Sequence, residues 1–135
     1  MYTIKQRSKA VHKQLTIIPN DGREQVIFNV DLIPEQVAGK FGELCWKIQQ
    51  ETEKKQVNAA ALGEAIVGLL TIIFGIEQTK TIMEIYKNNY TDLLLDITPF
   101  LIEEIKPAII EASKNKREEL QRLINESKQK KKFWK

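Results

Sequence analysis

The first pattern of apolar and polar residues in the chain is that of a β-hairpin. Residues 14–18 and 26–30 are short β-type runs, and a Pro-Asn-Asp-Gly sequence lies between them at 19–22. Proline presets φ and Asp-Gly tolerates positive φ, so this tetrad favours a turn. Because an isolated hairpin is marginal in water, we expect it to pack on helices or to extend a sheet through a partner subunit.

Helical spacing replaces this pattern from Pro34 onward. Pro34 opens a first helix, and its apolar residues recur three and four positions apart: Val37, Phe41, Leu44, Cys45 and Ile48. Trp46 lies off this stripe. We interpret it either as a partly buried edge of the core or as an anchor for a partner.

The most apolar stretch, residues 62–74, predicts the central helix of the fold. Its apolar residues lie on nearly every side, so other elements must cover several of its faces. We expect Asn58 to cap this helix and Gly75 to end it. Glu64, its only charge, is expected on a solvated stripe or paired with a basic residue; a catalytic or binding role is the alternative. The stretch is too short for a bilayer, which needs about 20 apolar residues.

The C-terminal half predicts further helices with two prolines among them. A third helix is expected over residues 76–88, and Thr91 is expected to cap a short segment over 92–97. Pro99 follows a threonine and predicts the start of another helix. Pro107 lies inside the apolar stripe of that helix, so we expect a kink or break just before it.

These elements predict a mainly α fold, a bundle of four to five helices with an N-terminal β-hairpin. We divide the chain into a basic flexible arm (1–13), a single helical domain with the hairpin (14–127) and a basic tail (128–135). Late in the domain a thin apolar seam lies among charged residues, which predicts a projecting helix that docks weakly or pairs with something else. The seam consists of Leu120, Leu123 and Ile124.

The formal net charge of +3 hides an uneven distribution. Residues 1–13 have a net charge of +4, residues 14–113 have −7 and residues 114–135 have +6. The basic ends fit a phosphate backbone, an acidic lipid or an acidic protein surface, or they are solvated tails. Phe133 and Trp134 in the basic tail admit a nucleic-acid interpretation, because aromatic rings stack on exposed bases.

The residues that most enzymes and metal sites need are scarce. His12 is the single histidine and Cys45 the single cysteine, which excludes an internal disulfide, a histidine-based triad of the usual kind and a His/Cys metal site. No phosphate-binding glycine pattern occurs. The adjacent Glu103 and Glu104 are interpreted as a solvated helix face. We therefore expect a protein that is not an enzyme and that has no cofactor or metal.

Several stretches of the middle and C-terminal half resemble small tail assembly chaperones of Gram-positive phages and prophages. They are residues 62–75, 85–90, 93–96, 99–100 and 105–113. The shared features are packing patterns and include no catalytic signature. The resemblance implies a mainly helical protein that oligomerises, binds the tape-measure protein during tail assembly and leaves the mature virion. Many such proteins also exist in a longer, frameshifted form, and the lysines at 130–132 are compatible with an adenine-rich slippery sequence.

The resulting hypothesis is a non-enzymatic tail assembly chaperone that forms homo-oligomers and binds the tape-measure or another tail protein. We expect an intracellular protein, because no apolar stretch of signal-peptide length follows the N-terminus, and the resemblance implies the cytoplasm of the bacterial host. No membrane partner is expected, because the most apolar stretch is too short for a bilayer. The alternative is a small nucleic-acid-binding or regulatory protein that uses its basic ends. The candidate partner-binding residues are Val26, Phe28, Trp46, Leu120, Leu123 and Ile124.

Overall fold

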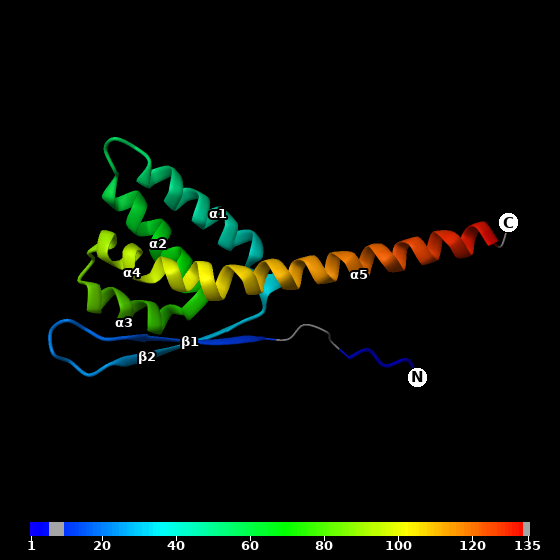
Figure 1. Cartoon of the computed structure of the whole chain (residues 1–135), viewed down its shortest axis with the longest axis horizontal. Helices are drawn as coiled ribbons and strands as arrows, with labels where there is room; N and C mark the ends of the chain where they lie inside the picture. The colour runs from blue at the N-terminus through cyan, green and yellow to red at the C-terminus, as the bar shows by residue number, and fades with distance from the viewer. Residues whose placement is uncertain (6–9, 134–135) are drawn as a thin grey trace.

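The computed structural model describes the backbone of residues 1–5 and 10–133 and the side chains of these residues up to 126. The elements are β1 (Val11–Ile17), β2 (Val26–Leu32), α1 (Pro34–Thr52), α2 (Ala59–Phe74), α3 (Ile76–Tyr86), α4 (Tyr90–Phe100), the π-helical turn η1 (Leu101–Ile105) and α5 (Lys106–Phe133). Since α4, η1 and α5 follow one another without a break, the described part has four helices and an N-terminal antiparallel hairpin (Figure 1). The predicted fold class is confirmed.

The hairpin lies along the helical body and contributes one strand to its core (Figure 1). Its strands pair in antiparallel register from Val11 opposite Leu32 to Ile17 opposite Val26. The inward side chains of β2 are buried from Phe28 onward, whereas those of β1 are only half-buried. β1 begins at Val11, so the predicted arm over 1–13 already contributes its last residues to the sheet.

Helix α2 is the central helix, as the sequence predicts. Its Leu62, Ile66, Leu69, Leu70 and Ile73 are buried, and the helix packs against α1, α3, α4 and β2. The Asn58 side chain accepts a hydrogen bond from the Ala61 backbone N–H at 3.2 Å, which is the expected cap. Gly75 ends the helix with a φ of 83°. Glu64 is exposed, and the first of its two structural alternatives, a solvated stripe, is confirmed.

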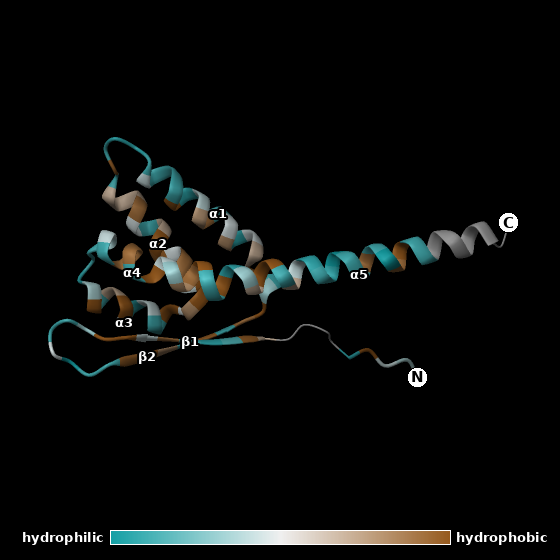
Figure 2. Ribbon diagram, viewed as in Figure 1, coloured by the Kyte–Doolittle hydropathy of each residue, from teal (hydrophilic) through white to brown (hydrophobic). Residues whose placement is uncertain are grey.

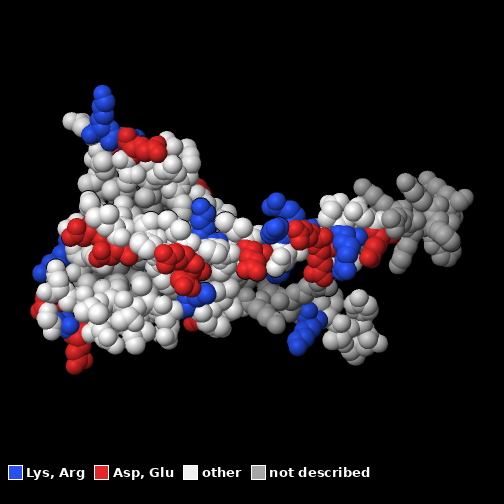
Figure 3. Space-filling model, viewed as in Figure 1, with Lys and Arg blue, Asp and Glu red and all other residues white. Residues whose placement is uncertain are grey.

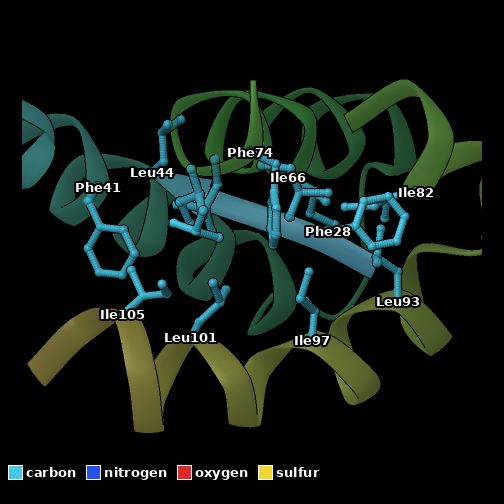
Figure 4. Close-up of a cluster of buried hydrophobic side chains, with 14 of the residues drawn as sticks. Phe28, Phe41, Leu44, Ile66, Phe74, Ile82, Leu93, Ile97, Leu101 and Ile105 are labelled. Atoms are coloured by element: carbon cyan, nitrogen blue, oxygen red, sulfur yellow. The ribbon is translucent and has the colours of Figure 1, made fainter. Parts of the chain in front are cut away.

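A row of buried side chains spaced four residues apart holds the C-terminal helix against the rest of the core. The row consists of Leu93, Ile97, Leu101, Ile105 and Ile109, and its first four members point into the core in Figure 4. In a regular α-helix each step of four residues rotates the side chain by about 40°, so such a row drifts around the helix. The wider turn of η1 takes back part of this drift and keeps the row facing the core.

The predicted helix start at Pro99 is wrong, and so is the predicted cap at Thr91. Asn89 caps α4, because its side chain accepts a hydrogen bond from the Asp92 N–H at 3.2 Å, and Pro99 lies inside this helix. The expected kink or break before Pro107 takes the form of η1, in which the Lys106 N–H bonds to the Leu101 carbonyl five residues back. A π turn is a known way to fit an irregularity into a helix without ending it.

Helix α5 extends far beyond the helical body (Figure 1). Brown and teal residues alternate along it, whereas the brown faces of the other helices turn toward one another (Figure 2). Its backbone is helical through Phe133, so it includes much of the predicted basic tail over 128–135; the side chains of that tail lie outside the described residues. None of the described helices combines the length and the apolar character needed to span a membrane.

Gly63 is needed where α2 meets the start of α4. A Cβ atom at Gly63 would lie 2.5 Å from the Tyr90 ring, whereas one at Gly39 on α1 meets nothing within 4 Å. We expect Gly63→Ala to lower the free energy of unfolding by about 1–3 kcal/mol through overpacking, despite the better helix propensity of alanine. Gly39→Ala, the matched control, is expected to raise it by about 0.5–1 kcal/mol. Urea unfolding measures both; equal effects of the two substitutions would contradict the close packing at Gly63.

Glu51 joins the end of α1 to the start of α2. Its carboxylate accepts hydrogen bonds from the Lys54 ammonium at 2.9 Å and the Asn58 N–H at 2.8 Å, and these bonds lower the pKa of Glu51. A lowered folded-state pKa stabilises the fold above the ordinary glutamate pKa, and this stabilisation is lost as the pH falls through the folded value. We expect Glu51→Gln to flatten the acid limb of a plot of thermal stability against pH; an unchanged limb would contradict this role.

Candidate partner-binding groove

An elongated groove of about 1040 Å³ separates α1 from the long C-terminal helix. One wall comes from α1 and the other from α4, η1 and the first three turns of α5, with Leu69 of α2 at the floor. Four buried residues close the groove toward the core, namely Phe41, Leu69, Leu101 and Ile109. These buried lining residues also belong to the packed core of the body.

Trp46 is the largest side chain of the α1 wall. It is 60% exposed although it lies beside the groove, and Cys45, Ile48 and Gln49 line the same wall. The sequence left two interpretations of Trp46 open, a partly buried core edge and an anchor for a partner. Its exposure and its place outside the set of residues packed against the core favour the anchor. A large aromatic side chain that lies beside an apolar groove is the type of residue that anchors protein partners.

The opposite wall is built from residues four positions apart on the outer side of the buried row. Ile102 and Ile110 are 56% and 53% exposed, and Lys106 and Lys114 alternate with them. Four-residue spacing places successive side chains next to one another on a helix. The exposed side chains of Ile102 and Ile110 are therefore each flanked by an ammonium group.

All the charged residues that line the groove are basic. They are Lys106, Lys114 and Arg117, and all three are exposed. At the Arg117 end, the ammonium of Lys116 lies 3.3 Å from the carboxylate of Glu35, which ties α5 to the first turn of α1. The groove thus combines an apolar floor with a basic rim, in a body whose sequence over 14–113 is acidic.

The Cys45 thiol in the groove wall is suited to packing rather than to nucleophilic chemistry. Burial raises the pKa of Cys45, and the charge of Lys106 opposes this with a smaller effect. A thiol with a raised pKa is protonated at neutral pH and is a weak nucleophile. Within the described residues, no group of three or more histidine, cysteine or acidic side chains could hold a metal ion.

The structure does not bring the candidate partner-binding residues of the hairpin to the surface. Phe28 is 2% exposed and packs edge-to-face on Phe74, so this candidate is corrected to a core residue. Val26 is half-buried at the start of β2, opposite Ile17. The alternation of the strand explains the correction, because residues 28, 30 and 32 share its inner face.

The three seam residues lie on the projecting part of α5, away from the groove. Leu120, Leu123 and Ile124 are exposed, and none of them lines the groove, whose last lining residue along α5 is Arg117. Acidic and basic side chains alternate along this part of the helix (Figure 3). Trp46 and the seam are therefore two separate surfaces.

Sequence reasoning missed Ile102, Ile110 and the three basic rim residues. The signal was present in the spacing, since residues 102, 106, 110 and 114 alternate apolar and basic at intervals of four.

No protein-family model, curated protein or solved structure matches this chain.

Proposed function

We propose that this protein is a non-enzymatic assembly chaperone of the phage and prophage tail type, which holds a helical segment of the tape-measure protein or another tail protein in the groove between α1 and α5. The observation that carries this proposal is the exposed ring of Trp46 beside a groove of about 1040 Å³ with an apolar floor. Amphipathic helices bind in such grooves through apolar side chains spaced three and four residues apart.

The positive charges at the groove rim favour a client helix that carries acidic residues beside its apolar face. Lys106, Lys114 and Arg117 line the groove without an acidic neighbour among its lining residues. Charges at the rim of an interface speed association and exclude partners of the wrong sign, and they contribute little to affinity. Burial of the apolar face against Trp46, Ile102 and Ile110 would supply most of the binding free energy.

The mixed charge of the described part of α5 favours a protein client over a nucleic acid. Between residues 106 and 126, five basic residues stand beside four acidic ones, and both signs lie on the face shown in Figure 3. A surface that tracks a phosphate backbone concentrates positive charge along one stripe. The described region therefore supports a protein-binding role for α5.

Replacement of Trp46 tests the groove. We expect Trp46→Ala to weaken binding of purified tape-measure protein by at least about tenfold, since a truncated hot-spot aromatic costs about 2 kcal/mol or more. Leu95→Ala is the matched control, because Leu95 is exposed on α4 outside the groove. Binding is measured by titration calorimetry and by protection of Cys45, the single cysteine, from alkylation. Steep salt-dependent DNA binding without capture of the tape-measure protein would refute the proposal.

Charge reversal at the rim tests the acidic character of the client. We expect Lys114→Glu to weaken binding about two- to fivefold at low salt, the range of an exposed ion pair, and the effect to vanish at high salt. Lys55→Glu makes the same charge change in the exposed connection between α1 and α2 and is expected to leave binding unchanged. Tighter binding by Lys114→Glu would show that the client is basic.

A further inference from the structure

The two outer edges of the hairpin differ in their hydrogen bonding. At the edge of β2, the Gln78 side chain accepts a hydrogen bond from the Asn29 N–H at 2.8 Å and donates one to the Asn29 carbonyl at 2.7 Å. The same amide also donates to the Phe74 carbonyl, which holds it against α2. A side chain of α3 thus occupies the hydrogen-bonding position that another strand would need beside β2.

The edge of β1 has its backbone groups directed outward at alternate residues. Both backbone groups of Asn29 point away from β1, so the pair formed by Asn29 and Gln14 is not hydrogen-bonded between the strands. The N–H and C=O of Gln14 therefore point away from β2. Because backbone direction alternates along a strand, the N–H and C=O groups of His12 and Thr16 also point away from β2. Among the described residues, β2 is the strand that pairs with β1, and no third strand joins the sheet.

The helical body covers the inner face of β1 less completely than that of β2. On the inner face, Phe28, Val30 and Leu32 of β2 are buried, whereas Val11, Leu15 and Ile17 of β1 keep partial exposure. Burial that decreases from β2 to β1 means that β1 lies at the margin of the body. Another strand beside β1 would pair these outward backbone groups, which make an edge strand a template for a further strand. Its own inner side chains would flank the half-buried apolar side chains of β1.

We infer that β1 pairs in antiparallel orientation with β1 of a second copy of this chain, with Gln14 on the two-fold axis, to form a four-stranded sheet. In this register all seven residues of each strand find a partner. The outward backbone groups of His12 then meet those of the partner's Thr16, and those of Gln14 meet those of the partner's Gln14. The interface is isologous, as two-fold symmetry requires.

Charge and the number of paired residues select this register over its two neighbours. With Gln14 on the axis, Lys13 stands opposite the partner's Leu15, and no like charges of the strand face each other. A slide that brings residue 13 onto the axis would place Lys13 opposite the partner's Lys13, and directly opposed like charges destabilise a sheet. A slide the other way would place Leu15 opposite the partner's Leu15 and pair only residues 13–17 of the seven-residue strand. Lys13 also keeps its own ion pair with Glu104 at 3.1 Å on the inner face.

This inference rests on the geometry of the hairpin, and its test does not depend on client binding. The full chain is examined by sedimentation over a concentration series, where a monomer–dimer equilibrium is expected. Residue 14 is the position of the strand that meets its own copy, so Gln14→Lys and Gln14→Glu each oppose like charges across the axis. We expect each variant to raise the dimer dissociation constant about threefold or more.

A mixture of the two variants gives the decisive result. Lysine from one variant then faces glutamate from the other, and we expect a 1:1 heterodimer at least as tight as the wild-type dimer, recovered through an affinity tag on one partner. Asn29→Lys is the control: its outer-face position is adjacent to Gln14, but in the dimer the two lysines lie three strand spacings apart, about 14 Å. That separation exceeds the Debye length of about 8 Å at physiological salt, so no change is expected.

Three results would overturn the inference: a wild-type chain that stays monomeric throughout the series, a dimer that both Gln14 variants leave unchanged, or a mixture that associates no better than either variant alone. Circular dichroism of each variant checks that the hairpin and helices are intact. If the charge-swap result holds while Trp46→Ala has no effect on client binding, the β1 pairing stands and the groove proposal fails.

Discussion

The fold depends on the packing of one row of aliphatic side chains, Leu93, Ile97, Leu101, Ile105 and Ile109, against α2 and α1. Each of these side chains is nearly fully buried, and burial of a leucine or isoleucine side chain contributes about 1.5–3 kcal/mol. Together they outweigh the local cost of two prolines in the same helix, about 3 kcal/mol for an interior position. The helix continues through Pro99 and Pro107 because the burial of this row stabilises the helical conformation on both sides of each proline.

The groove follows from where that row ends. Ile109 is the last fully buried residue of α5 in the described part, and beyond it the helix leaves the body while α1 begins on the other side. The residues next to the row, Ile102 and Ile110, belong to the same helix but have no element of the body to cover them. An apolar groove forms at this point because only the first half of the long helix packs against the body.

Local signals predicted the hairpin and the central helix from the sequence, while tertiary packing decided the rest. The turn at 19–22, the Asn58 cap and Gly75 act within a few residues, so their outcome does not depend on distant contacts. Pro99 has the sequence signal of a helix start, and only the buried row shows that the helix runs through it. Trp46 and Ile110 line one groove although 64 positions separate them, and a single sequence does not reveal such a pairing.

The groove and the edge of β1 lie on different elements and share no residue, which has a consequence for assembly. The β1 edge uses backbone groups of His12, Gln14 and Thr16, whereas the groove uses side chains of α1 and the C-terminal helix. A dimer formed through β1 would therefore use none of the residues that line its two grooves. Two linked sites raise the effective concentration of the second site for a long helical client, so a pair of modest grooves would hold such a client more tightly than one copy could.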